Sequence, residues 1–188
     1  MNLRSKKPAL LLIDVQKGFL DEAFWGGNRN NKNAEQICSE LLKKWRELQL
    51  PVIHIRHSSK NPQSKLHHTN AGFDFNELVA PLPDEIVITK EVNSAFIGTN
   101  LKDTLDKQQI DTLVIGGITT NHCVSTTTRM AANYGYSVYL AADACACFDL
   151  TGVDGKHYDS QLIHEITLAN LHNEFATVCQ ANQIFEML

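Results

Sequence analysis

Residues 112–135 read TLVIGGITTNHCVSTTTRMAANYG, and this stretch decides the fold class. It opens at 112–115 with a short apolar run that is typical of a buried strand. A Gly-Gly turn follows, and residues 123–134 then show a helical pattern that Gly135 can terminate. A strand that passes directly into a helix is the repeating unit of α/β proteins.

The rest of the chain repeats this alternation. Continuous apolar runs, as strands covered on both faces require, occur at 9–15, 52–55, 86–88, 137–141 and 175–178. Helical spacing occurs at 37–48, 99–108 and 160–171. Because parallel neighbours need crossover connections, we predict a three-layer α/β/α, Rossmann-like fold with a mainly parallel six-stranded sheet. We expect residues 1–188 to form a single domain.

Charge and composition exclude several classes of function. The chain has 17 basic and 21 acidic residues, and its net charge of −4 gives no electrostatic footprint for a nucleic acid or an anionic bilayer. No stretch approaches the roughly 18 apolar residues of a membrane span, and the first apolar run is short for a signal peptide. Five cysteines without paired zinc-type spacing indicate reduced thiols. We expect a cytoplasmic protein with a small-molecule substrate, no cofactor, and no nucleic-acid or membrane partner.

Three residues that can carry chemistry follow three different apolar runs: Asp14, Lys90 and Cys123. Taken singly, such residues are more often a helix or loop cap, a solvated lysine and a small core cysteine. Ligands of open α/β sheets, however, gather at the carboxyl ends of the strands. Their joint placement at one sheet edge therefore favours an active site.

Cys123 has the strongest physical case, because it falls in the first turn of the predicted helix, just after the cap-type residues 119–121. There the helix dipole stabilises a thiolate, and the Lys90 ammonium is expected to lower the pKa of the thiol further. Asp14 can accept the thiol proton, and Lys90 can orient that carboxylate. The direction of the Asp14 pKa shift stays open, since burial and Lys90 oppose each other.

Three segments resemble the signature blocks of a known family. They read LLLIDVQKGF at 10–19, ITKEVNSAF at 88–96 and GGITTNHCVSTTTRMAANYGY at 116–136. Together with DACACFDLTGVDG and IHEITLANL, they are similar to the isochorismatase-like cysteine hydrolases, which include the nicotinamidases. The resemblance extends from about residue 8 to about residue 180, and three ordered blocks make it specific.

This resemblance implies a mechanism. In this implied mechanism, Asp14 is the general base and Lys90 is its electrostatic partner. Cys123 is the nucleophile that forms a covalent, thioester-type intermediate. The resemblance also implies a cis peptide bond between Ile118 and Thr119, and an oxyanion hole formed by the backbone N–H groups of Thr119 and Cys123. The implied reaction is hydrolysis of a C–N bond in a small amide, ureido or related compound. The implied assembly is a homo-oligomer, either a dimer or a tetramer.

The substrate pocket is predicted near the same strand ends. We place six residues in it: Gln16, Phe19, Trp25, His57, Asn93 and Phe96. Gln16 lies on the Asp14 side of its strand, where it is as compatible with a structural cap as with a brace for the site. Large aromatic residues near strand ends are equally often ordinary core. The long irregular stretch at 58–83 is expected to form a wall of the pocket or an oligomer contact.

The nicotinamidase branch carries an Asp-x-His metal pair just after the second strand, and this chain departs from that pattern. Arg56 stands at the aspartate position and Ser58 at the histidine position. A divalent ion therefore loses two ligands and meets a guanidinium, so we predict no catalytic metal. Four histidines in this region are expected to be packed or solvated: His54, His57, His67 and His68. The same departure puts nicotinamide in doubt as the substrate.

Three alternative functions stay open. The first is isochorismatase-type vinyl ether hydrolysis led by Asp14, and the second is a non-catalytic relative that binds a metabolite. The third is a thiol sensor built on Cys145 and Cys147, whose C-x-C spacing differs from the redox-type C-x-x-C. For that pair, two packed and inert thiols are the preferred interpretation.

Overall fold

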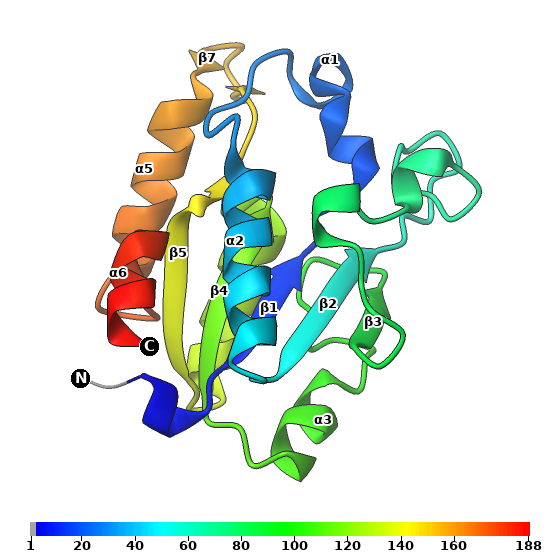
Figure 1. Cartoon of the computed structure of the whole chain (residues 1–188). Coiled ribbons are helices and arrows are strands. Elements are labelled where there is room, and N and C mark those ends of the chain that lie inside the picture. Colours follow the sequence, from blue (N-terminus) through cyan, green and yellow to red (C-terminus); the bar gives the residue numbers. More distant parts are fainter. Residues whose placement is uncertain (1–2) are drawn as a thin grey trace.

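The computed structural model describes residues 3–188. A six-stranded sheet runs through the molecule in the order β3-β2-β1-β4-β5-β8, and each neighbouring pair is parallel (Figure 1). The prediction of a six-stranded parallel sheet is confirmed. The strands are β1 (Ala9–Ile13), β2 (Val52–His57), β3 (Ile86–Lys90), β4 (Thr112–Ile118), β5 (Ser137–Ala146) and β8 (Thr177–Cys179).

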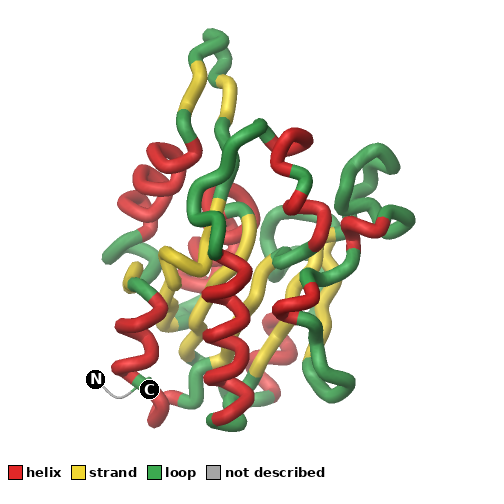
Figure 2. The backbone as a smooth tube through the Cα atoms, turned by 45° about the horizontal axis from the view of Figure 1, so that its top comes forward, coloured by secondary structure: helices red, strands yellow, loops and turns green. Residues whose placement is uncertain are grey.

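Helices cover both faces of this sheet, which makes three layers. Apolar side chains of α2 and α6 pack on one face around Trp45, and those of α3, α4 and α5 pack on the other around Leu113 and Ile115 (Figures 1 and 2). The helices are α1 (Glu22–Trp25), α2 (Ala34–Glu47), α3 (Leu101–Lys107), α4 (Ser125–Asn133), α5 (Ser160–Leu171) and α6 (Ala181–Met187). Within residues 3–188, no helix has the length and apolar character needed to cross a membrane.

The strand order places a crevice beside β1. The chain builds outward from β1 to β2 and β3, and then returns to add β4 on the other side of β1. Such a reversal leaves a gap between the two crossover connections at the carboxyl ends of the central strands. Asp14 follows β1 directly at this point, and the turn that carries Cys123 follows β4.

Several predicted boundaries differ from the structure for local reasons. The first strand is predicted to reach residue 15 but ends at Ile13, because Asp14 adopts a left-handed φ of 53°. The strand predicted at 137–141 continues to Ala146, and the last strand lies at Thr177–Cys179 rather than 175–178. Helix α5 has the predicted bounds.

Some small elements are not evident from the sequence pattern. They include the short helix α1, the C-terminal helix α6, and a hairpin of β6 (Leu150–Thr151) and β7 (His157–Tyr158). The hairpin projects from the end of the molecule that also bears the carboxyl ends of the main strands (Figure 2). Its strands are two residues long, so no alternating pattern could announce them.

Gly117 permits the close approach of β1 and β4. It pairs with Ile13 across the two strands and has a φ of 139°, which L side chains rarely adopt. A Cβ atom at this position would lie 2.0 Å from the carbonyl oxygen of Ile13, the residue before Asp14. Any side chain here therefore pushes apart the two strands that carry the candidate site.

We predict that Gly117→Ala destabilises the fold by about 4 kcal/mol or more, or prevents folding, because backbone atoms on β1 cannot yield. Gly135→Ala is the matched control, since Gly135 also has a positive φ but a Cβ atom added there would meet nothing within 4 Å. That control should cost only about 1–2 kcal/mol, the usual strain of a left-handed residue. Urea unfolding of both variants measures the difference, and equal losses would contradict the close approach.

Candidate active site

The three chemistry-bearing residues predicted from the strand ends meet in one buried cluster. Asp14 follows β1, Lys90 ends β3, and Cys123 lies in the π-helical turn η5 (Thr120–Val124) after β4. The Nζ atom of Lys90 lies 2.6 Å from Asp14 Oδ2 and 3.2 Å from Cys123 Sγ. All three side chains are buried, and Asp14 and Lys90 are almost completely removed from solvent. An ion pair and a thiol thus share one site.

His57 completes the surroundings of the Lys90 ammonium. Its Nδ1 atom lies 3.2 Å from Lys90 Nζ, and the two residues are register partners at the ends of β2 and β3. An ammonium has three donors and no acceptor, so its three contacts account for all of its hydrogen-bonding capacity. His57 must therefore present the lone pair of Nδ1. Burial first, and then the charge of Lys90, lower the pKa of His57, which keeps the ring neutral.

Gln16 supports this arrangement from behind and does not line the pocket, which corrects its predicted placement there. Its side chain donates to the backbone oxygens of His57 (3.1 Å) and Phe73 (2.8 Å). It also accepts from the His57 N–H at 2.8 Å. Gln16 is therefore a brace that ties the end of β2 to the long loop that follows it.

The pKa of Cys123 differs from the expectation that the helix terminus and Lys90 lower it. Burial, reinforced by the carboxylate of Asp14, raises the pKa of Cys123 to about 12, and Lys90 only partly offsets this. Burial also raises the pKa of Asp14 against the opposing effect of Lys90. Desolvation of the buried sulfur therefore outweighs the stabilisation expected from a helix N-terminus. At neutral pH the sulfur is a thiol.

A proton acceptor lies beside that thiol. Ligand atoms of Asp14, His57 and Cys123 all lie within 4.8 Å of one another. The Oδ1 atom of Asp14 is buried and has no hydrogen-bond partner within residues 3–188. A buried acceptor without a partner costs free energy, so a proton from the sulfur is favoured there. The geometry supports proton transfer from Cys123 to Asp14 when the sulfur attacks.

The Ile118–Thr119 peptide bond before the turn that carries Cys123 is cis, as the family resemblance implies. The same turn is supported by contacts that sequence patterns do not reveal. The hydroxyl of Thr120 lies 2.9 Å from Nδ1 of His164 on α5. Asn31 contacts the other ring nitrogen at 3.4 Å and donates to the Cys145 carbonyl at 2.7 Å. This buried network joins the turn to α5 and β5.

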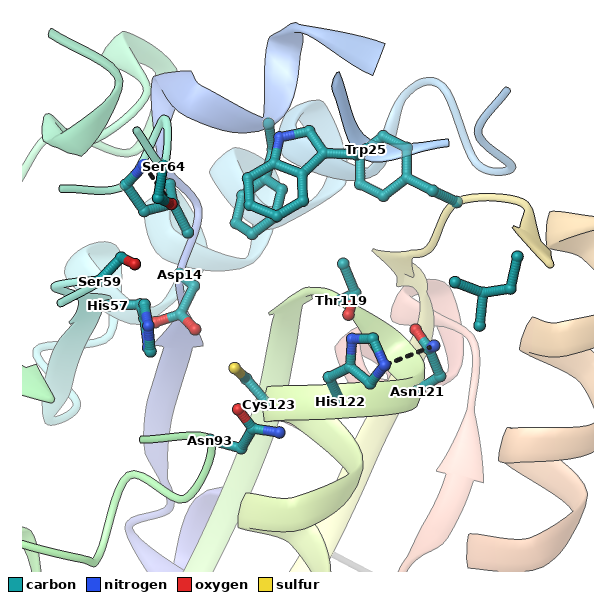
Figure 3. Close-up of a pocket in the computed structure, with 14 residues that line it drawn as sticks. Asp14, Trp25, His57, Ser59, Ser64, Asn93, Thr119, Asn121, His122 and Cys123 are labelled. Atoms are coloured by element: carbon teal, nitrogen blue, oxygen red, sulfur yellow. Dashed lines mark hydrogen bonds between the residues drawn. The ribbon is translucent and has the colours of Figure 1, made fainter. Parts of the chain in front are cut away.

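A pocket of about 240 Å³ opens onto Cys123 (Figure 3). Four of the six residues predicted for it line it, but Phe96 does not. Phe96 packs in the core, with ring centroids 5.3 Å from Tyr134 and 6.0 Å from Tyr136. The lining residues are Asp14, Phe19, Trp25, His57, Ser59, Ser64, Leu66, Asn93, Thr119, Asn121, His122, Cys123, Phe148 and Leu150.

Sequence reasoning misses part of this lining for identifiable reasons. Asn121 and His122 stand immediately before Cys123, so proximity alone could have indicated them. Ser59, Ser64 and Leu66 belong to the 58–83 loop, which is predicted to form a pocket wall and does contribute one. Phe148 and Leu150 follow a strand whose predicted end lies too early.

The side-chain atoms of this cluster are of the kinds that bind metal ions, but the cluster already contains a positive charge. Asp14, His57 and Cys123 offer ligand atoms within reach of one centre, but the ammonium of Lys90 already contacts all three. A divalent cation there would meet a positive charge at bonding distance. Arg56 points away from the cluster, with Nε donating to Thr89 Oγ1 and the guanidinium 4.3 Å from the centre of the Phe73 ring. These residues do not fit a metal.

Cys145 and Cys147 are free, buried thiols. Burial raises the pKa of each to about 12, and the Cys147 thiol donates to the Ser160 carbonyl at 3.2 Å. Both observations agree with the interpretation of two packed thiols and give no support to a sensor.

Comparison with known proteins places the chain among similar sequences and structures. The isochorismatase domain model matches residues 8–183. An uncharacterized isochorismatase family protein of Bacillus subtilis (strain 168), YrdC, is 49% identical over 179 residues, which cover 95% of each chain. Nicotinamidase 3 of Arabidopsis thaliana is 30% identical over 197 residues, covering 96% of this chain and 88% of that protein. A crystal structure of an isochorismatase-family protein from Chromobacterium violaceum ATCC 12472 has a TM-score of 0.94 and 42% identity, covering 100% of this chain and 96% of that one.

We predict that Asp14→Asn accelerates alkylation of Cys123 by iodoacetamide at every pH from 7 to 10. The carboxylate charge raises the pKa of the thiol, so its removal lowers that pKa and increases the thiolate fraction, about tenfold for each unit. Mass spectrometry of the Cys123 peptide gives the rate. Asp103→Asn, on the exposed side of α3, is the control and should match the wild type. A wild-type profile for Asp14→Asn would show that the two groups do not interact.

Proposed function

The chain belongs to the isochorismatase family and is a hydrolase of that family, and on this premise we propose that it cleaves the C–N bond of a small amide, ureido or related compound through a covalent intermediate on Cys123. One observation carries this proposal. A neutral thiol that lines the pocket lies beside an open carboxylate oxygen, and both are held by one ammonium.

In the proposed first step, the Cys123 sulfur attacks the carbonyl carbon while its proton passes to Asp14. The backbone N–H groups of Thr119 and Cys123 are proposed to stabilise the oxyanion, because both residues line the pocket at the turn after β4. The C–N bond then breaks. Asp14 returns the proton to the leaving nitrogen, which departs as ammonia or an amine and leaves a thioester on Cys123.

In the proposed second step, a water molecule attacks the thioester carbon. Asp14, again a carboxylate, takes one proton of this water, and the second tetrahedral intermediate collapses with loss of the sulfur. The proton returns to Cys123, so the thiol is regenerated and a carboxylic acid leaves. Lys90 holds Asp14 in place throughout, and its charge lowers the cost of a sulfur anion at 3.2 Å.

Two features support a C–N bond as the target. A general base with a raised pKa can return its proton to a nitrogen leaving group, which must be protonated before it departs. The relative named nicotinamidase 3 is, by that name, an amidase, and it is similar over nearly the whole chain. For this chain, the ion pair beside a nucleophilic sulfur supplies the matching chemistry.

We predict that Cys123→Ala and Cys123→Ser abolish turnover and leave the fold intact; Cys123→Ala also lowers the free energy of unfolding, because it removes one of the three acceptors of the buried Lys90 ammonium. Cys179→Ala, at a half-buried cysteine on β8, is the control and should retain full activity. The assay is a screen of small amides for ammonia release, with intact-mass detection of the acyl adduct on the wild type. Near-normal rates in Cys123→Ala would exclude covalent catalysis and favour vinyl ether hydrolysis led by Asp14.

We also predict that exhaustive chelator treatment leaves activity unchanged, because the Lys90 ammonium fills the place that a divalent ion would need. Metal content is measured before and after treatment, together with the turnover rate. Stoichiometric zinc in the active protein, with activity lost on its removal and restored on its return, would contradict this expectation.

A further inference from the structure

The pocket has an unusual balance of charge. Among its lining residues, Asp14 is the sole carboxylate, and neither lysine nor arginine is present. The two lining histidines, His57 and His122, have pKa values that burial lowers, so both are neutral at physiological pH. The wall that meets a substrate therefore offers no cation.

The cationic side chains close to the pocket already interact with other protein groups. Lys90 is 1% exposed, and all of its donors are taken by protein atoms. Arg56 is held over the Phe73 ring. Lys65, between two lining residues, pairs with Asp21 at 2.7 Å on the surface. A carboxylate on a substrate would lose water in the pocket and gain no partner in return.

One side of the pocket is an apolar wall of rings (Figure 3). The centroid of the Phe19 ring lies 4.8 Å from that of Trp25 and 6.1 Å from that of Phe148. The indole N–H of Trp25 donates to the Gly18 carbonyl at 2.7 Å, which fixes the ring and removes its donor from the cavity. Leu66 packs into the same cluster.

The opposite side carries neutral polar groups near Cys123. Asn93 lies beside the sulfur in Figure 3, whereas Thr119 and Asn121 line the pocket farther from it, with Asn121 next to the His122 ring. Each of the three side chains can donate and accept hydrogen bonds. Such groups match an uncharged carboxamide, which has both donors and acceptors.

We propose that this pocket selects uncharged substrates that carry a small apolar ring beside the scissile group, and that it excludes compounds with a free carboxylate. The inference rests on the proposed function of the same site and narrows its substrate class. The volume of about 240 Å³ leaves room for one ring and its amide group. Isochorismate, a diacid, falls in the excluded class, which sets aside the vinyl ether alternative.

The test compares two alkylating reagents of nearly equal size, neutral iodoacetamide and anionic iodoacetate, on the native protein at pH 9. The ratio of their rates at Cys123 is divided by the same ratio for glutathione, which removes intrinsic reactivity. We expect a normalised ratio of at least about 10 in favour of iodoacetamide, because the carboxylate of iodoacetate loses water in the pocket and finds no free cation among the lining residues. A normalised ratio near 1 would overturn the proposal.

A variant at the rim sharpens this result. Leu150 lines the pocket and is 38% exposed, so Leu150→Arg adds a cation with little disturbance of the core. The normalised ratio should fall at least about threefold in Leu150→Arg and stay near the wild-type value in Leu150→Gln. An equal fall in both variants would show that charge does not govern access.

A competition experiment tests the proposed preference for an apolar ring. Benzamide should slow iodoacetamide labelling of Cys123, and benzoate at the same concentration should not. Protection by benzoate, or by neither compound, would overturn the proposed class. None of these measurements requires turnover, so the selectivity can be judged even if the screen for hydrolysis finds no substrate.

Discussion

The buried ammonium of Lys90 is the constraint on which the site depends. An isolated charge in a protein interior costs several kcal/mol, and only complete hydrogen bonding to good acceptors offsets that cost. Here the acceptors come from three separate segments, namely the residue after β1, the end of β2 and the turn after β4. The sheet must therefore bring these three segments close together.

That requirement explains features of the fold that otherwise look unrelated. Asp14 leaves the strand geometry immediately after Ile13, which turns its carboxylate toward the sulfur rather than into the sheet. Gln16 holds the backbone of His57 through two hydrogen bonds. His164 and Asn31 hold the far side of the nucleophile turn. Polar residues that sequence patterns treat as loop or core residues thus form a continuous support.

The sequence predicts the parts of the structure that follow from periodicity and strand ends. The six parallel strands can be predicted in this way, and the meeting of Asp14, Lys90 and Cys123 follows from their places after strands. The contact of His57 with Lys90 cannot be predicted from the sequence, because the predicted second strand stops at residue 55. The expected lowering of the Cys123 pKa is wrong, since burial raises this pKa and is a property of packing and not of spacing. Single-domain organisation, oligomeric state and cytoplasmic location stay predictions.

The position of Leu150 separates the part of the chain that shapes the pocket entrance from the part that holds the catalytic residues. It belongs to a hairpin with two-residue strands, outside the six-stranded sheet, and yet it borders the pocket. Insertions or exchanges in that hairpin could reshape the entrance without altering the backbone that presents Asp14, Lys90 and Cys123. The architecture therefore lets substrate specificity diverge between relatives while the catalytic centre stays the same. Specificity and catalytic mechanism can then evolve at different rates.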